Sequence, residues 1–276
     1  MSWLETLFGT TKPVIAMVHL PALPGTPLYA GKDGMDTVVE QVRQDLRCLQ
    51  AGGVDAVMFC NENDRPYTFT AAPSVVAAMA YTVGRLRDEV SVPFGVDILW
   101  DPVASVALAH SVGAAFVREV FTGVYDSDMG LWQSRAAEAL RLRAALGAAE
   151  AIRLLFNVSA EFAQPVSRRS VAELARSVAF SSLPDAICVS GPMTGEPVAI
   201  EDVERVVRAV ATVGPTPVVV NTGVSHANVS DYLRRADGVI VGTALKVDGR
   251  TFNPVDQARV ERFMAQVRQA RAVSPV

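Results

Sequence analysis

Short runs rich in β-branched residues alternate with helix-like segments along the whole chain. Each run is nearly continuous in hydrophobicity, which is typical of parallel strands that are buried on both faces. The pattern predicts eight strands, at Val14–His19, Val54–Phe59, Phe94–Ile98, Ala115–Arg118, Ile152–Asn157, Ala186–Val189, Pro217–Val220 and Gly238–Val241.

The segments between these runs carry apolar residues three or four positions apart, as on one face of a helix. Three of the resulting stripes are Val38/Val42/Leu46/Leu49, Val203/Val206/Val207/Val210 and Val260/Phe263/Met264/Val267. The expected helix boundaries agree with this interpretation. Gly52-Gly53 follows the first stripe, and Asp256 precedes the last one as a predicted N-cap.

Eight strand–helix units in series, without a linker or a change of composition, predict an α/β protein with the (β/α)8 architecture of a TIM barrel. The length of 276 residues is close to the roughly 250 residues typical of that fold. We expect a single domain over residues 1–276. An open doubly wound sheet is the alternative, but HLPALPGTP after the first strand lacks the G-x-G-x-x-G pattern of dinucleotide-binding domains.

Composition narrows the possible partners. Half of the residues are hydrophobic, 20% are charged and the mean hydropathy is +0.25, which excludes a mainly disordered chain. The formal net charge is -4, and no Lys/Arg cluster interleaves with aromatic residues, so we expect no nucleic-acid partner. The cysteines Cys48, Cys60 and Cys188 show no C-x-x-C spacing and predict neither a disulfide framework nor a zinc site.

No segment predicts membrane insertion or export. The strongest apolar stretch, Val75–Val83, is far shorter than the roughly 20 residues that span a bilayer. The N-terminal sequence MSWLETLFGTTK contains Glu5 and lacks the basic start of a signal peptide. We therefore expect a cytoplasmic protein without an integral membrane segment.

The loops after the seventh and eighth strands are candidates for anion binding. Gly223 and Gly242 allow a ligand to approach the backbone closely, and Gly242, Thr243 and Ala244 are expected to open a short helix whose free N–H groups suit an oxyanion. Phosphate sites in barrels lie at these two loops. We predict that Gly223, Val224, Gly242 and Thr243 bind a phosphate. The alternative is that the glycines only form tight turns.

Acidic residues follow the third and fourth strands, where the strand ends of a barrel face a common mouth. Asp97 and Glu119 lie nearest the barrel. Carboxylates crowded in a partly apolar pocket push each other's pKa values apart, which suits acid and base roles. We predict that these two acids form the catalytic pair and that Asn61 orients the substrate.

Other charged residues of the mouth receive weaker assignments. Arg118 is expected to bind substrate, or to pair with Asp97 or Glu119 and hold it ionised. Glu62 and Asp101 stand further from the barrel, and for both we favour a solvated loop charge or a helix N-cap over a functional role.

Histidines supply one further candidate. His19 ends the first strand and is predicted to be catalytic, with a hydrogen-bonded packing role as the equal alternative. His110 falls inside a helix pattern and is interpreted as structural. His226 stands beside the proposed phosphate loop, where it either contacts the anion or caps the helix.

Polar residues after the fifth, sixth and seventh strands are predicted to bind substrate. They are Asn157, Ser190, Gly191, Thr194 and Asn221. The segment SGPMTGEP after the sixth strand is rich in small residues, so it can present hydroxyl and backbone N–H groups to a ligand.

Metal and cofactor sites are not predicted. The long loop after the fourth strand, TGVYDSDMGLW, contains Asp126 and Asp128, whose spacing suits Mg2+ only if further ligands are present. A role in the turn is favoured for both. The sequence also lacks the G-x-S-x-G, H-E-x-x-H and P-loop motifs.

Four segments resemble the BtpA/SgcQ family, namely KPVIAMVHLPALPGTP, GGVDAVMFCNENDRPY, SGPMTG, and ADGVIVGTALK together with NPVDQARVERFM. The resemblance extends over nearly the whole chain. It implies a barrel of the ribulose-phosphate-binding type, in agreement with the phosphate prediction. One branch of the family is linked to biogenesis of photosystem I as a membrane-extrinsic factor, and SgcQ-like members are described as enzymes of sugar metabolism or nucleosidases.

The mouth differs from the usual family pattern. Cys60 stands where members typically carry Glu, while Asp97, Glu119 and Glu161 are acids that the pattern lacks. The matching residues are Asn61, Asp64, Arg118, Asp128, Gly191 and Gly195. This combination predicts a retained anion site with altered chemistry or an altered substrate.

Two functions follow as hypotheses. The first is an enzyme that acts by acid–base chemistry on a phosphorylated, ribosyl-type small molecule, through glycosidic cleavage, isomerisation or a lyase step. The second is a non-enzymatic assembly factor that uses the barrel surface and exposes an apolar patch. No cofactor is expected, and a homo-oligomer is left open.

Overall fold

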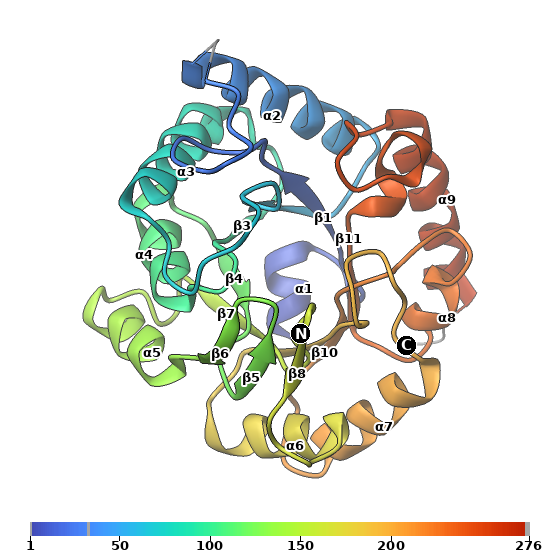
Figure 1. The fold of residues 1–276 in the computed structure, drawn as a ribbon. Helices are drawn as coiled ribbons and strands as arrows, with labels where there is room; N and C mark the ends of the chain where they lie inside the picture. The colour runs from blue at the N-terminus through green and yellow to red at the C-terminus, as the bar shows by residue number, and fades with distance from the viewer. Residues whose placement is uncertain (1, 32–33, 274–276) are drawn as a thin grey trace.

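The computed structural model describes residues 2–31 and 34–273. Eight parallel strands close into a barrel in the order β1-β11-β10-β9-β7-β4-β3-β2, and helices surround it (Figure 1). The predicted (β/α)8 fold is therefore confirmed. The barrel strands are β1 (Val14–His19), β2 (Ala56–Cys60), β3 (Phe94–Asp97), β4 (Phe116–Glu119), β7 (Arg153–Asn157), β9 (Ala186–Val189), β10 (Val218–Val220) and β11 (Gly238–Val241).

The helices of the outer layer follow the barrel strands, and all but the last, α9, connect one strand to the next. They are α2 (Gly34–Ala51), α3 (Pro73–Leu86), α4 (Pro102–Val112), α5 (Ala136–Ala145), α6 (Val171–Ser181), α7 (Ile200–Ala211), α8 (Val229–Leu233) and α9 (Gln257–Val273). Short 3-10 turns occur at η1 (Arg87–Glu89), η2 (Thr243–Leu245) and η3 (Val247–Gly249). Within the described residues, no helix combines the length and the apolar character needed to cross a membrane.

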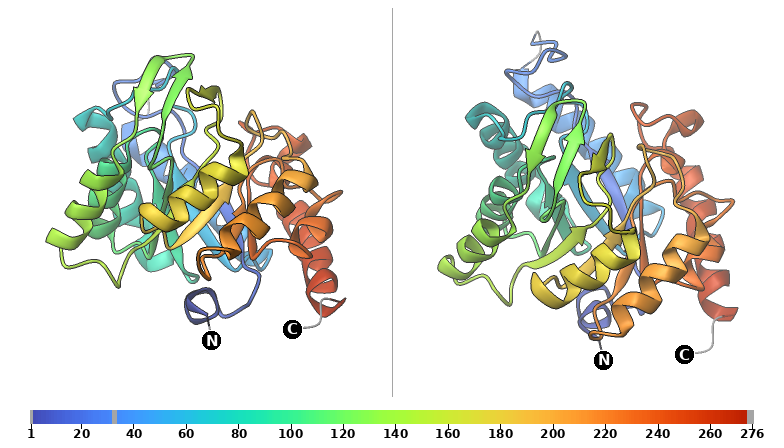
Figure 2. Two further views of the ribbon diagram at one scale, coloured as in Figure 1. Left: turned by 90° about the horizontal axis from the view of Figure 1, so that it is seen from below. Right: turned by 60° about the horizontal axis from the view of Figure 1, so that its bottom comes forward.

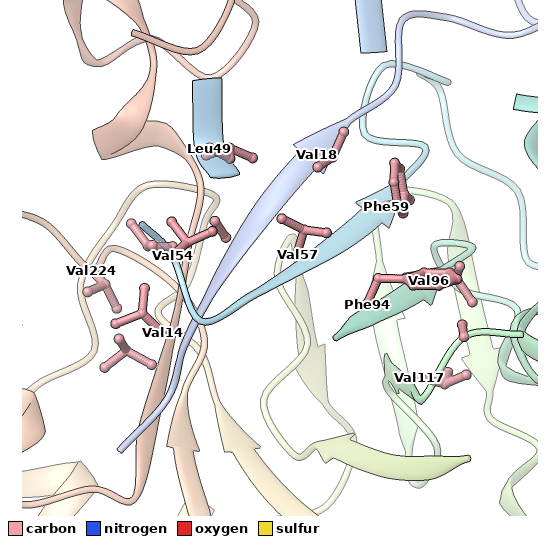
Figure 3. Close-up of a cluster of buried hydrophobic side chains, with 14 of the residues drawn as sticks. Val14, Val18, Leu49, Val54, Val57, Phe59, Phe94, Val96, Val117 and Val224 are labelled. Carbon is pink, nitrogen blue, oxygen red and sulfur yellow. The ribbon is translucent and has the colours of Figure 1, made fainter. Parts of the chain in front are cut away.

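Strand residues are buried on both faces of the sheet, which explains their continuous hydrophobicity. Val14 and Val18 of β1 pack toward the helices together with Leu49 of α2 (Figure 3). The alternate residues Ile15 and Met17 face the barrel interior, where a second apolar cluster lies. The helical stripes predicted for α2, α7 and α9 form the other side of the strand–helix layer.

Three predicted strands match the observed bounds, and the others shift by one or two residues at an end. The largest shift is in β2, which starts at Ala56 and not at Val54. Asp55 uses its carboxylate to accept the backbone N–H of Val14 at 2.8 Å. This contact ties the lower end of β2 to β1 through a side chain and not through the ladder.

Helix α1 (Trp3–Phe8) was not predicted, and it closes the lower end of the barrel. Ser2 and Glu5 form a capping box at its start, a signal that the sequence does contain. Phe8 packs edge-on against Phe116 of the barrel interior, with ring centroids 5.6 Å apart. Figure 1, which looks along the barrel, shows α1 inside the ring of strands.

The segment interpreted as a long loop after the fourth strand instead forms part of an antiparallel sheet, with β5 (Val124–Ser127), β6 (Gly130–Gln133) and β8 (Ala163–Pro165). Asp128 lies in the turn of the β5–β6 hairpin, as predicted. Trp132 packs against Trp100 at 4.9 Å between ring centroids, so the hairpin is anchored to the loop after β3. Figure 2 shows the hairpin at the end of the barrel opposite α1.

Candidate active site

A cavity of 410 Å³ opens at the C-terminal ends of the barrel strands. Active sites of TIM-barrel enzymes lie at this end of the fold. Its walls come from residues far apart in the sequence, including Met17, His19, Glu62, Arg118, Glu161, Thr194, Asn221, Gly223, Val224, Gly242, Thr243 and Arg259.

One wall of the cavity is suited to an anion. Gly223, Val224, Gly242 and Thr243 all line it, as the loop sequences predicted. No hydrogen bond within residues 2–31 and 34–273 uses the backbone N–H of Val224 or of Thr243. A phosphate oxygen could therefore accept these N–H groups without displacing an existing partner.

Arg259 adds a cation to this wall, and the sequence analysis did not identify it. Asp256 caps the start of α9 by accepting the Arg259 N–H at 3.2 Å, as predicted for an N-cap. The first turn of α9 thereby directs Arg259 toward the mouth, and its Nε donates to the carbonyl of Ala244 at 2.9 Å. His226 lies beside it, 3.1 Å from the Arg259 carbonyl. The sequence did contain a signal for Arg259, because it stands three residues after the predicted N-cap Asp256, in the first turn of the helix.

Gly223 of this wall, and Gly191, which does not line the cavity, are needed for a structural reason that the sequence did not reveal. Gly223 has φ +68°, and a Cβ there would lie 2.2 Å from the backbone carbon of Glu196. A Cβ on Gly191 would lie 2.0 Å from the carbonyl oxygen of the same residue. Both glycines thus allow the β9–α7 loop to pack against its neighbours.

The other wall is acidic. Glu62 and Glu161 approach each other across the mouth through one hydroxyl group, the Oγ1 of Thr194, which lies 3.2 Å from Glu62 Oε1 and 2.7 Å from Glu161 Oε2. Thr222 donates a further hydrogen bond to Glu161 Oε1 at 2.8 Å. The two carboxyl groups and the two hydroxyl groups that hold them therefore come from four different loops.

Glu62 corrects a prediction. It was interpreted as a solvated loop charge, but its side chain is 7% exposed and lines the cavity. Burial, and then the nearby charge of Glu161, raise the pKa of Glu62 to about 8. Glu62 therefore holds a proton near neutral pH and is able to donate it.

Arg118 and Asp97 lie deeper in the barrel. Arg118 Nη2 pairs with Asp97 Oδ2 at 3.0 Å, which is one of the two pairings predicted for Arg118. Arg118 Nε and Asp97 Oδ1 are buried and have no hydrogen-bond partner. Burial raises the pKa of Asp97 to about 6, although Arg118 opposes the rise. Of this pair, only Arg118 lines the cavity.

Glu119 lines a second, smaller cavity of 30 Å³ beside the first. Its carboxylate accepts the backbone N–H of Trp100 at 2.6 Å and that of Val120. Burial, followed by the charge of Asp97, raises the pKa of Glu119 to about 8. The charge of Asp97 therefore acts on Glu119, and Arg118 interacts electrostatically with both acids.

His19 ends β1 between the main cavity and a neighbouring surface groove. Its side chain is 8% exposed, and Nδ1 has no hydrogen-bond partner. Burial, and then the charge of Lys246, lower the pKa of His19 to about 3. The imidazole is therefore neutral at physiological pH and can accept or donate one hydrogen bond to a ligand.

Two of the predicted substrate-binding residues, Asn157 and Asn221, share Ser190 as a hydrogen-bond partner. Its Oγ accepts Nδ2 of Asn157 at 2.9 Å and Nδ2 of Asn221 at 2.8 Å. Asn221 lines the main cavity, and its Oδ1 is buried without a partner. Asn157 lines the smaller cavity, and Thr194 lines both.

Asn61 holds the loops together and lies outside both cavity walls. Its Oδ1 accepts the N–H of Leu99 at 2.9 Å, and its Nδ2 donates to Asp64 at 3.1 Å. Asp101 caps α4 by accepting the Ala104 N–H, which confirms the N-cap interpretation.

Metal ligation has no structural support within the described part of the chain, where no cluster of three His, Cys, Asp or Glu residues is arranged around a possible ion. Asp126 lies on β5 and Asp128 in the following turn. His110 lies on α4, away from both cavities.

Comparisons with known proteins agree with the barrel and identify the family. The chain is 45% identical to the sgc region protein SgcQ of Escherichia coli (strain K12), over 98% of this chain and 100% of that protein. It is 34% identical to the photosystem I biogenesis protein BtpA of Synechocystis sp., over 97% and 92% of the two chains. Tryptophan synthase of Mycobacterium tuberculosis shares the fold, with a TM-score of 0.63, 18% identity and coverage of 97% and 98%. The BtpA family model matches residues 10–269, so this chain belongs to the BtpA family.

Proposed function

We propose that this barrel is an enzyme that acts by acid–base chemistry on a phosphorylated, ribosyl-type small molecule. One observation supports this most strongly: a single cavity joins a wall of glycine loops and Arg259 to a wall that carries Glu62 and Glu161. A ligand that spans the cavity would have its phosphate fixed at one end and its reacting carbon placed at the other. Positioning of this kind supplies a large part of enzymatic rate enhancement.

The anion end would be formed by the free N–H groups of Val224 and Thr243, with Arg259 as the cation. Charge-assisted hydrogen bonds to phosphate are roughly twice as strong as neutral ones. Asn221 Oδ1 would accept a hydroxyl of the sugar, because it is buried and lacks a partner.

At the acidic end, Glu62 would act as the proton donor. Its raised pKa keeps a proton available, and it faces the cavity. In glycosidic cleavage, this proton would go to the leaving group as the bond to the anomeric carbon breaks, and Glu161 would stabilise the positive charge that develops on the sugar. An isomerisation or a lyase step would use the same donor and carboxylate.

Asp97 and Glu119 remain in the proposal as a second pair of proton-transfer groups. Asp97 pairs with Arg118, Glu119 lines the smaller cavity together with Arg118, and the charge of Asp97 acts on Glu119. If they take part in the reaction, Asp97→Asn and Glu119→Gln should each lower turnover by about 100-fold, the usual scale for acid–base groups.

A surface role in assembly is the second candidate. Three apolar side chains are strongly exposed, Leu131 on β6 and Phe180 and Leu183 at the end of α6. They provide apolar contact area, and a relative is named for photosystem I biogenesis. Such a role does not need an occupied cavity.

Calorimetric titration with inorganic phosphate and ribose 5-phosphate tests the enzyme proposal. Gly242→Asp places a negative side chain in the anion wall and should weaken both ligands at least tenfold. Gly214→Asp makes the same change where a Cβ has no neighbour within 4 Å, and should bind as the unmodified protein does. Arg259→Gln provides a second test without a new charge. Unchanged affinity in folded Gly242→Asp and Arg259→Gln would place the anion site elsewhere.

A further inference from the structure

Two carboxyl groups of the cavity share one hydroxyl group as a hydrogen-bond partner. Thr194 Oγ1 lies within hydrogen-bond distance of both Glu62 and Glu161, but a hydroxyl can donate only once. The shorter distance, 2.7 Å, is to Glu161, which also accepts from Thr222. Glu161 thus receives two hydrogen bonds, as an ionised carboxylate does. Glu62 fits the remaining contact if it is protonated and donates to Thr194.

The negative charge at Glu161 has no cation of its own. Among the ion pairs of the described residues, none involves Glu62 or Glu161. Arg118 lines this side of the cavity, and the charges of Asp97, Glu161 and Glu119 all act on it. Its ion pair is with Asp97, at 3.0 Å. Because one guanidinium faces several carboxyl groups, a positively charged ligand group would be favoured beside Glu161.

Asn221 gives an independent indication of what the ligand must offer. The residue lines the cavity and is 7% exposed, its Nδ2 donates to Ser190, and its Oδ1 is buried without a hydrogen-bond partner. This oxygen can only accept a hydrogen bond. The acidic side of the cavity therefore presents acceptors and calls for a ligand rich in donors. An ammonium group carries three N–H donors and a positive charge on one atom, whereas a hydroxyl carries one donor and no charge.

We infer that the substrate is a phosphorylated amino sugar or a similar phosphorylated amine, whose ammonium group binds at Glu161 and Asn221 while its phosphate binds at the opposite wall. The inference rests on the proposed function and narrows its substrate class. The two walls have opposite electrostatic character, since Arg259 lines the anion wall and Glu161 the other. A ligand with one negative and one positive end matches both, and a neutral sugar phosphate matches only one.

Calorimetric titration with two matched pairs of ligands tests this inference. The pairs are glucosamine 6-phosphate with glucose 6-phosphate, and glucosamine 1-phosphate with glucose 1-phosphate, so the amino group lies at different distances from the phosphate. In at least one pair, the amino sugar should bind about tenfold to a hundredfold more tightly, the scale of a charge-assisted hydrogen bond in a partly buried site. Equal affinity within about twofold in both pairs would overturn the inference.

Failure of the inference is distinguishable from failure of the proposed function. If the sugar phosphates bind more tightly than inorganic phosphate but without preference for the amine, only the inference is wrong. If neither these four ligands nor ribose 5-phosphate binds more tightly than inorganic phosphate, both are wrong.

Variants assign the preference to Glu161. Glu161→Gln should reduce the preference for the amino sugar to within about twofold and leave the affinity for inorganic phosphate unchanged. Glu150→Gln removes the same charge from a side chain that is 92% exposed, and should keep the full preference. A preference that survives in folded Glu161→Gln would show that the ammonium binds elsewhere. The comparison of ligands on the unmodified protein decides the inference even if this variant does not fold.

Discussion

Replacement of Glu62 by Gln should remove one contribution that lowers the free energy of unfolding of the unmodified protein as the pH rises. The folded chain holds the Glu62 proton up to a pKa of about 8, against an ordinary value of 4.5. Between these two values the unfolded state has lost a proton that the folded state retains. Each unit rise in pH therefore lowers the free energy of unfolding by about 1.4 kcal/mol. Gln cannot titrate, so the variant lacks this loss.

The expected size follows from the same two pKa values. Over the full interval of about 3.5 pH units, the penalty amounts to at most about 5 kcal/mol. Between pH 5 and pH 8, the part that falls in this window is about 3 kcal/mol. Glu62→Gln should thus gain about 3 kcal/mol relative to the unmodified protein on going from pH 5 to pH 8. Gln preserves the size of the side chain and an oxygen that can face Thr194.

Urea unfolding at pH 5, 6, 7 and 8 measures the effect as the difference in free energy of unfolding between the two proteins. Other buried acids titrate in both proteins, so their contributions cancel in this difference. Glu150→Gln serves as the control, because it removes an exposed carboxylate and should follow the pH dependence of the unmodified protein. Parallel curves for Glu62→Gln and the unmodified protein would refute a proton held by Glu62.

Three further outcomes are expected. Gly223→Ala should destabilise the fold by about 2 kcal/mol or more, because φ is +68° and a Cβ would overlap the neighbouring backbone. Thermal unfolding measures this loss, and Gly214→Ala is the control that should be unaffected. Lys246→Met should cost about 3–5 kcal/mol in urea unfolding, because it leaves the buried Asp45 without the Nζ contact at 2.6 Å; a loss below about 1 kcal/mol would contradict this. The ring of His19 should show no titration in NMR spectra between pH 5 and 8, because its pKa is about 3. The unfolded state takes up a proton at this ring more readily than the folded state does, so the free energy of unfolding should fall as the pH falls from about 6.5 toward 3.

The barrel could be predicted from sequence because its strands carry a strong and local signal. β1, β9 and β11 are uninterrupted apolar runs, and their observed bounds equal the predicted ones. The β5–β6 hairpin has no such signal, since it is anchored by the contact of Trp132 on β6 with Trp100 in the loop after β3. Its strands form where packing on the barrel mouth favours them, and this cannot be read from their own residues.

The two walls of the cavity also differ in how well the sequence predicts them. Gly223 and Gly242 could be identified because their place in the barrel fixes their surroundings. The burial of Glu62 depends on Thr194, which lies 132 residues further along the chain. A carboxylate on a loop has no sequence signal that distinguishes a solvated position from a buried one, so Glu62 was assigned to solvent.

Hydrogen-bond satisfaction separates the acids of the mouth into two classes. The Asp101 carboxylate accepts the backbone N–H groups of Ala71 and Ala104 and pairs with Arg135, so its role in holding the loops explains its presence. Asp97 keeps a buried oxygen without a partner, and Glu62 is buried without a cation. A buried acid that lacks a hydrogen-bond partner or a cation lowers stability, although removal of Asp97 alone would leave Arg118 unpaired. Buried acids with raised pKa values in a barrel mouth are candidates for ligand chemistry, which is the role proposed for them.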